Sequence, residues 1–159
     1  CGTAPQLMVF GMREALDMIF EEGLENIYER HRVLAEATHA AVEVWSQAGT
    51  LSLNAIEPKE RSTAVTTILT DEGVDANMIR DVCRDEMMVG LGGGLGNLAG
   101  RAFRVGHMGD MNAPMLFAAL ASIEATFRYL DIKFAPGGVT AAIEHVAQSK
   151  KVGTGPFSY

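Results

Sequence analysis

A glycine-rich stretch followed by a short strand carries the residue best suited to chemistry in this sequence, Arg104. Residues 90–112 read GLGGGLGNLAGRAFRVGHMGDMN. Successive side chains of a strand alternate between two faces, so Phe103, Val105 and His107 share one face while Arg104 points the other way. The apolar pair can face a core, and the small residues beside Arg104 leave room for its guanidinium. Such a guanidinium is suited to binding a carboxylate through two parallel hydrogen bonds.

The other chemically capable residues form weaker patterns. The run Gly92–Gly96 lacks the strand–loop–helix context and the lysine of a phosphate-binding loop, which favours a turn over dinucleotide binding. The four histidines are scattered without a cysteine or carboxylate cluster, so the sequence predicts no metal site. Cys83 falls inside a predicted helix without a nucleophile's partners, and we assign no catalytic residue. A structural role is expected for His107, and composition alone would make Arg104 an ordinary surface arginine.

The periodicity of apolar residues defines the elements that must position Arg104. Thr3 is expected to cap the first helix, with Gln6 completing a capping box, and Asn112 is expected to cap a later one. Two helices followed by strands that alternate with helices predict an α/β fold, a small sheet with helices on one face. The predicted helices span about 3–23, 24–49, 75–87, 112–130 and 139–146, and the predicted strands span 51–55, 64–70 and a short segment around residue 104.

Composition places the chain among acidic globular proteins. It has 159 residues, 48% of them hydrophobic, and a net charge of −7 at pH 7. This length suits one domain with a core, and the absence of a basic cluster argues against nucleic acid or an anionic membrane as partner. No apolar run has the length of a transmembrane helix. With two cysteines, Cys1 and Cys83, no disulfide framework is expected, and a cytoplasmic location is the default expectation.

Several short motifs extend along most of the chain, and together they identify a resemblance. They are Met12-Arg-Glu-Ala-Leu16, Glu21-Glu-Gly-Leu-Glu-Asn26, Arg30-His-Arg32, Gly92-Gly-Gly-Leu-Gly96, Leu98-Ala-Gly100, Phe103-Arg-Val-Gly-His-Met-Gly-Asp110 and Pro136-Gly-Gly-Val-Thr-Ala-Ala-Ile143. In this order they resemble the class V aminotransferases, most closely the serine–glyoxylate and alanine–glyoxylate branch. The resemblance runs from residue 1 to about residue 148, which makes it far more specific than any one motif.

The resemblance implies the C-terminal small domain of a fold-type-I enzyme that uses pyridoxal 5′-phosphate. This domain is expected to hold a small, mainly antiparallel sheet with helices on one face, preceded by long connecting helices. By the resemblance, Arg104 binds the substrate carboxylate, and Thr3 contacts the cofactor phosphate across a homodimer interface. The predicted division is a helical segment linking the large and small domains (1–48), the small domain (49–150) and a tail (151–159).

The resemblance also implies groups that these residues do not supply. The family's Schiff-base lysine precedes the position of Thr3, and the four lysines present, at 59, 133, 150 and 151, lie in other contexts. We therefore expect the cofactor to be bound mainly by an N-terminal large domain, and this segment alone to be inactive. The implied reaction moves an amino group from serine or alanine to an oxo acid such as glyoxylate or pyruvate, in two half-reactions.

Two alternatives stay open at the level of the sequence. One is another class V branch, such as a phosphonate transaminase. A cysteine desulfurase needs a cysteine on a mobile loop, and the helical setting of Cys83 counts against that branch. The other alternative is a non-catalytic binding module that retains the small-domain fold without cofactor. A missing large domain predicts an exposed apolar surface, to which the 8–19 helix stripe would contribute.

Overall fold

A computed structural model describes residue 2 and residues 4–149 of the chain and shows a four-stranded antiparallel sheet with helices. The strand order is β1-β2-β4-β3, and every neighbouring pair is antiparallel. The strands are β1 (Leu51–Leu53), β2 (Val65–Thr70), β3 (Gly92–Gly93) and β4 (Ala102–Gly106), and the α-helices are α1 (Gln6–Glu22), α2 (Leu24–Trp45), α3 (Ala76–Asp85), α4 (Ala113–Tyr129) and α5 (Gly138–Gln148).

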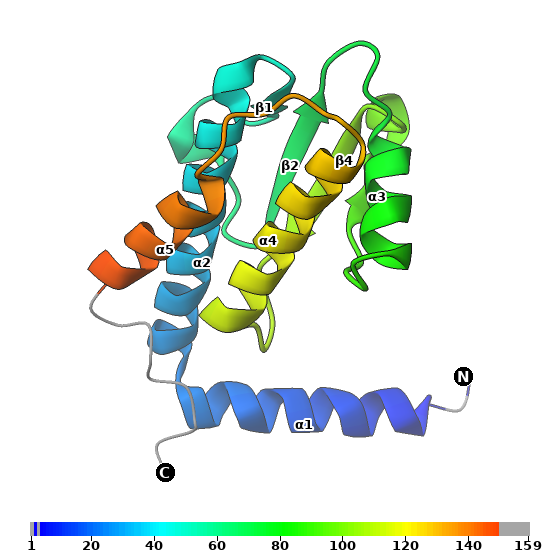
Figure 1. Ribbon diagram of the computed structural model, residues 1–159. Helices are drawn as coiled ribbons and strands as arrows, with labels where there is room; N and C mark the ends of the chain where they lie inside the picture. The colour runs from blue at the N-terminus through cyan, green and yellow to red at the C-terminus, as the bar shows by residue number, and fades with distance from the viewer. Residues whose placement is uncertain (1, 3, 150–159) are drawn as a thin grey trace.

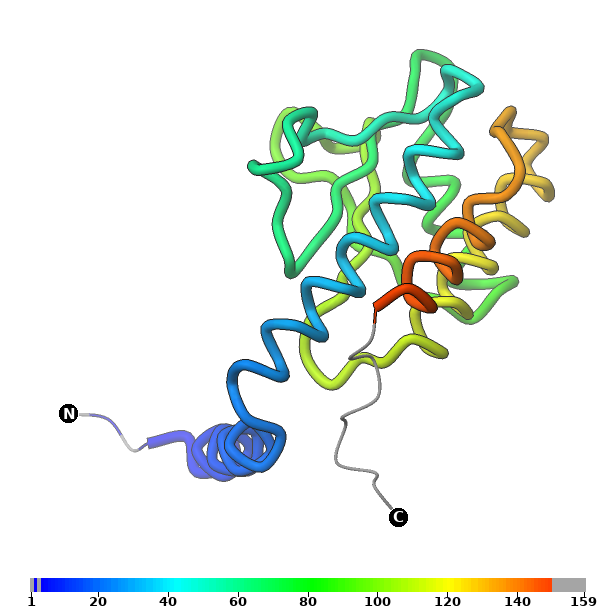
Figure 2. Tube along the Cα trace, turned by 90° about the vertical axis from the view of Figure 1, so that its left-hand side faces the viewer, coloured from blue at the N-terminus to red at the C-terminus, as the bar shows by residue number. Residues whose placement is uncertain are grey.

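The sheet and the helices form two layers with the core between them. In Figure 1, α4 crosses in front of the sheet, and α2 and α3 lie to either side of it. Figure 2, turned by 90°, places the strands on the left and α4 and α5 on the right, with α2 between. This confirms the predicted α/β class with an antiparallel sheet and helices on one face. The core joins all the strands but β3 to α2–α5 through fully buried Trp45, Ile68, Phe103, Leu116, Leu120, Ile123 and Phe127.

The strand register separates a buried sheet face from an open one. Ile68 pairs with Phe103 and Thr66 with Val105, and all four side chains are buried on the helix side. The intervening pairs point the other way, because side chains alternate along a strand. This second face carries Arg104 and is only partly covered. Burial of the apolar positions therefore fixes the face on which Arg104 lies.

Helix ends follow the sequence signals except at the first helix. The Asn112 side chain accepts a hydrogen bond from the Met115 N–H at 3.0 Å, as expected of a cap. Asp75 caps α3 in the same way. The first helix begins at Gln6, with Pro5 in the cap position and no side-chain cap. The prediction that Gln6 completes a capping box is therefore wrong, because Gln6 is the first helical residue and not the third. The other half of that prediction, Thr3, lies outside the described residues.

A buried indole anchors α5 to the rest of the fold. The Trp45 Nε1–H donates to the Glu124 carboxylate at 2.8 Å, and the Val139 N–H donates to the same oxygen at 3.1 Å. The start of α5 reaches this position because Gly138 packs its backbone against the indole ring, where a Cβ would lie 2.7 Å from Trp45 Cδ1. One carboxylate oxygen thus joins α2, α4 and α5.

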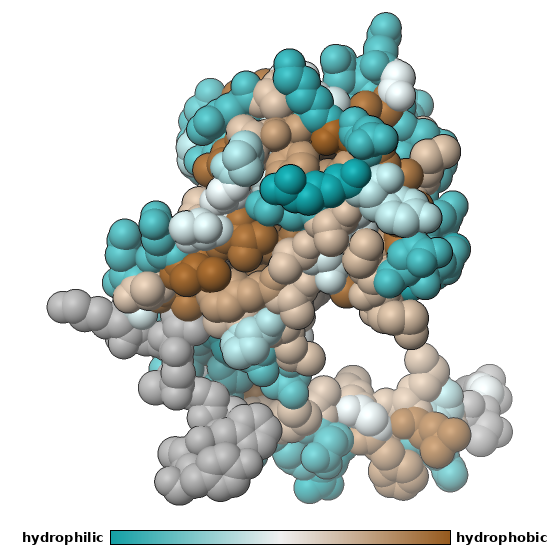
Figure 3. Space-filling model, viewed as in Figure 1, coloured by the Kyte–Doolittle hydropathy of each residue, from teal (hydrophilic) through white to brown (hydrophobic). Residues whose placement is uncertain are grey.

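The first helix contributes nothing to this core. None of its residues is buried, and Leu7, Met8, Phe10 and Phe20 are each more than 60% exposed. Figure 1 shows α1 extending beneath the rest of the fold, and Figure 3 shows apolar side chains along it. Helix α2, by contrast, buries much of its length in the core. The division predicted near residue 48 stays a prediction, as does the role of 1–48 as a link between domains.

In the described part of the chain, no helix combines the length and the apolar character needed to cross a bilayer.

Replacing Gly138 with alanine is expected to destabilise the fold. The added methyl group enters the space of the Trp45 ring, and such overpacking costs about 1–3 kcal/mol of unfolding free energy. Gly11→Ala is the matched control, because Gly11 lies within α1 and a Cβ there meets nothing within 4 Å. Urea unfolding followed by circular dichroism measures both variants. Equal midpoints for Gly138→Ala and the unchanged chain would contradict this packing account.

Candidate functional site

Arg104 lies in the middle of β4 on the open face of the sheet. Its neighbours along the strand, Phe103 and Val105, are buried on the helix side, so the backbone presents the arginine outward. Across the sheet it faces Thr67 on β2 and Gly92 on β3. Cross-strand partners share a face, so the arginine lies between a hydroxyl side chain and a residue with no side chain at all.

The guanidinium of Arg104 is held by the backbone and not by an acid. Its Nε–H donates to the Gly93 carbonyl at 2.8 Å. Across the described ranges, no carboxylate lies within ion-pair distance of it. Its terminal amino groups, Nη1 and Nη2, therefore keep the parallel geometry that binds a carboxylate through two charge-assisted hydrogen bonds.

The glycine run allows close packing and contains a strand that the sequence does not predict. Gly92 and Gly93 form β3, whereas the sequence predicts only a connection there. A Cβ on Gly92 would lie 3.2 Å from Arg104 Cβ and 3.3 Å from its Nε. A Cβ on Gly94 would collide with the Leu98 backbone. The glycines thus permit a close approach between chain segments. Gly92 lies directly opposite Arg104, so the glycine run and the strand that carries the arginine form one structural unit.

His107 occupies the core side of the sheet, as the predicted alternation requires. Its Nδ1 lies 3.1 Å from the Thr63 carbonyl and its Nε2 lies 2.9 Å from Thr66 Oγ1. A carbonyl only accepts, so Nδ1 carries the hydrogen and Nε2 accepts from the threonine hydroxyl. Burial lowers the pKa of His107 to about 4, against a smaller opposing effect of the Thr63 hydrogen bond. This neutral imidazole links the end of β4 to β2 and to the segment before it, which is a structural role.

Cys83 lacks the surroundings of a reactive cysteine. Cys83 is fully buried in α3, and burial raises the pKa of its thiol, which keeps it protonated. The described residues contain no group of three or more metal-binding side chains close enough to hold an ion. Of the two binding candidates from the sequence, Arg104 lies within the described residues and Thr3 lies outside them.

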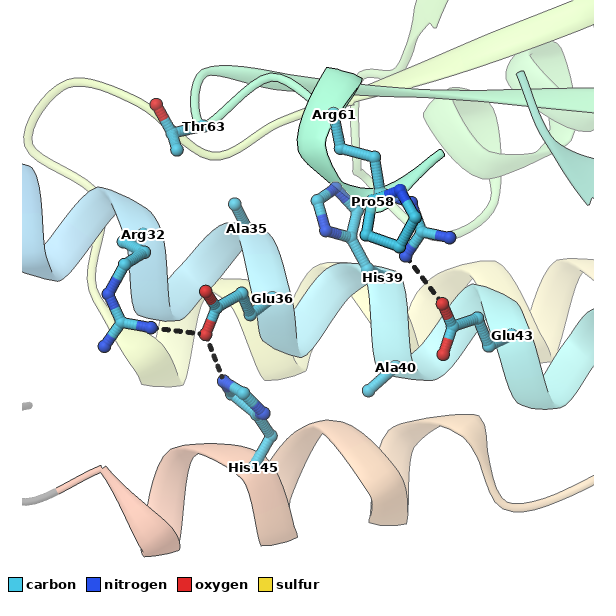
Figure 4. Close-up of a pocket in the computed structure, with 10 residues that line it drawn as sticks. All are labelled: Arg32, Ala35, Glu36, His39, Ala40, Glu43, Pro58, Arg61, Thr63 and His145. Carbon is cyan, nitrogen blue, oxygen red and sulfur yellow. Dashed lines mark hydrogen bonds and ion pairs between the residues drawn. The ribbon is translucent and has the colours of Figure 1, made fainter. Parts of the chain in front are cut away.

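A cleft of about 460 Å³ between α2, α5 and the segment near Pro58 is the main alternative site. Figure 4 shows that its charged side chains pair with one another. Arg32 donates to Glu36 at 2.6 Å, and His145 Nε2 lies 3.2 Å from the same carboxylate. Arg61 donates to Glu43 at 2.6 Å. Because Arg32 and Arg61 already have anionic partners, the cleft offers a charged ligand less than Arg104 does.

Comparison of the sequence with known proteins finds aminotransferases. The serine–glyoxylate aminotransferase of Methylorubrum extorquens is 43% identical over 148 residues, covering 92% of this chain and 36% of that protein. The L-aspartate–glyoxylate aminotransferase of Paracoccus denitrificans is 35% identical, again over 92% of this chain and 36% of that protein. The chain thus spans about a third of the length of these curated relatives. No family model matches the chain.

Solved structures show the same likeness in three dimensions. The ureidoglycine–glyoxylate aminotransferase from Bacillus subtilis superposes with a TM-score of 0.80 at 26% identity, covering 92% of this chain and 37% of that one. The alanine–glyoxylate aminotransferase from Nostoc sp. superposes with a TM-score of 0.69 at 34% identity, covering 80% of this chain and 33% of that one.

The buried His107 is expected to make stability depend on pH. Its pKa in the fold, about 4, lies below its ordinary value of 6.5, so the unfolded chain binds more protons between these values. Stability therefore falls as the pH drops from about 6.5 toward 4, by up to about 3 kcal/mol. Burial also lowers the pKa of His39, which adds in the same direction.

Unfolding free energies at pH 7 and pH 5 measure this effect, with His107→Gln as the comparison. Glutamine does not titrate, so most of the pH dependence is expected to disappear in this variant. An equal loss of stability in both proteins would show that other groups control the acid response.

Proposed function

The chain is a homologue of the class V serine–glyoxylate and alanine–glyoxylate aminotransferases over about a third of their length, and from that premise we propose that it forms the carboxylate-binding small domain of such an enzyme. The substrates would be a small amino acid, such as serine or alanine, and an oxo acid, such as glyoxylate or pyruvate. Both classes carry a carboxylate beside the reacting carbon, so one arginine can bind the substrate in each half-reaction.

The unpaired guanidinium of Arg104 carries this proposal. It is partly buried on the open sheet face, it is fixed at Nε by Gly93, and no described carboxylate neutralises it. Its role toward a substrate is to hold the carboxylate at a defined position and angle, so that the neighbouring carbon is oriented for reaction. It binds and orients and moves no proton, so we assign no catalytic residue to the chain.

The described residues do not by themselves fit a pyridoxal phosphate site. The chemistry of that cofactor requires a lysine held at the reacting carbon, and the described lysines, Lys59 and Lys133, are both exposed on the surface. We propose that the cofactor is bound mainly by an N-terminal large domain outside this chain, with Thr3 contacting its phosphate from the neighbouring subunit of a homodimer. This segment alone would then be inactive.

The apolar surface of α1 supports a covering partner. Its side chains at 7, 8, 10, 12 and 20 are at least 60% exposed, and the helix has little contact with the core. Exposed apolar residues gathered on one element are typical of a surface that another domain or chain covers. The large domain, or the second subunit of the dimer, is the occupant that the homology favours.

A non-catalytic binding module is the second candidate, because the core of α2–α5 and the sheet closes within the chain. The intact mass of the polypeptide in its native host separates the two. A mass well above 17.1 kDa supports the enzyme, whereas a mass close to 17.1 kDa favours the module. Another class V branch, such as a phosphonate transaminase, would share the larger mass and differ in the substrates it accepts.

Replacing Arg104 with alanine in the longer enzyme is expected to weaken substrate binding far more than cofactor binding. Loss of two charge-assisted hydrogen bonds should raise KM for both amino acid and oxo acid by about 100-fold. Cofactor affinity, followed by its absorbance, should change little. Arg101→Ala is the control, because Arg101 is exposed and makes no side-chain bond among the described residues. Equal losses of substrate and cofactor affinity would instead assign Arg104 a structural role.

A further inference from the structure

Two backbone carbonyls at the free edge of the sheet, one in β3 and one just before it, accept hydrogen bonds from arginines. Strand β3 pairs with β4 on one side only, and the Gly94 N–H bonds to the Ala102 carbonyl within that pair. Successive residues of a strand turn their polar backbone groups to opposite sides, so the Gly93 carbonyl points to the free edge. Edge carbonyls need partners from outside the sheet. Here that partner is the Nε–H of Arg104 at 2.8 Å.

The side chain of Arg104 reaches this edge by crossing over Gly92. The two residues are register partners, and the position of a Cβ on Gly92 lies 3.3 Å from Arg104 Nε and 3.6 Å from its Cζ. The arginine therefore lies flat in the space that any larger residue would fill. Two residues earlier, the Leu91 carbonyl accepts from Arg80 Nε at 3.2 Å. Both carbonyls thus receive an arginine Nε–H.

We propose that β3 positions Arg104 for its substrate, with the Gly93 carbonyl occupying Nε so that the carboxylate binds end-on to Nη1 and Nη2. This inference rests on the proposed role of Arg104. Gly92 and Gly93 act through the arginine and are positioning residues. A guanidinium fixed at Nε loses less conformational freedom when the carboxylate arrives, and Nη1 and Nη2 remain as its donors.

Nitrogen-detected NMR of arginine side chains in the 159-residue chain tests the contact without enzyme activity. The Nε–H of Arg104 should exchange with water about tenfold or more slowly than that of exposed Arg101, because a hydrogen bond protects it. Gly92→Ala should remove this protection and leave that of Arg80 intact. Gly90→Ala is the control, because a Cβ on Gly90 meets nothing within 4 Å. Exchange of Arg104 as fast as that of Arg101 in the unchanged chain would overturn the proposal.

The same variants in the longer enzyme connect the contact to function. Gly92→Ala should raise KM for both substrates by about tenfold with a smaller change in kcat, whereas Gly90→Ala should change neither. An unchanged KM for Gly92→Ala beside a large loss for Arg104→Ala would overturn the positioning role and leave the carboxylate site standing. A protected Nε–H with no loss for Arg104→Ala would instead overturn the proposed function.

Discussion

Burial of Phe103 and Val105 is the constraint on which the candidate site depends. Both side chains enter the core beneath the helix layer, and Phe103 also contacts the ring of Phe127 on α4, with 6.2 Å between ring centroids. Because the side chains of a strand alternate between its two faces, burial of Phe103 and Val105 on the helix side places Arg104 on the opposite face. A shift of one residue in register would bury the guanidinium and expose both apolar groups, at a large cost in free energy.

Arg104 is available to an anion because no described carboxylate pairs with it. Arg30, Arg32 and Arg61 are each bonded to glutamates: Arg30 links α2 to α1, Arg61 links the loop before β2 to α2, and Arg32 pairs within α2. Arg104 is bonded to a carbonyl instead, which fixes its direction without neutralising its charge. Under the proposed function, a substrate carboxylate would therefore not have to displace a protein acid before it binds. That difference, and not cavity size, distinguishes the open sheet face from the cleft beside α5.

The described residues form a closed core and one helix that lies outside it. Helices α2 to α5 and the sheet share a closed core, in which Trp45, Glu124 and Gly138 hold three helices at one point. Helix α1 leaves its apolar residues uncovered. Helix α1 and the core helices show the same apolar periodicity. Periodicity identifies an apolar stripe but carries no information about which surface covers it. The curated relatives are about three times longer, and a partner domain or subunit over this stripe is part of the proposed function.

The sequence by itself determined the α/β class, the stop of the first helix at Gly23, the cap at Asn112 and the opposite faces of Phe103 and Arg104, because these follow from local periodicity and cap chemistry. Its motifs also identified the family. Only the tertiary structure decided that β3 forms at the glycine run and that the Gly93 carbonyl holds Arg104, since both depend on strands brought together across 11 residues. Likewise, the start of α1 at Gln6 without a side-chain cap and the exposure of its apolar stripe depend on surroundings that local sequence does not encode.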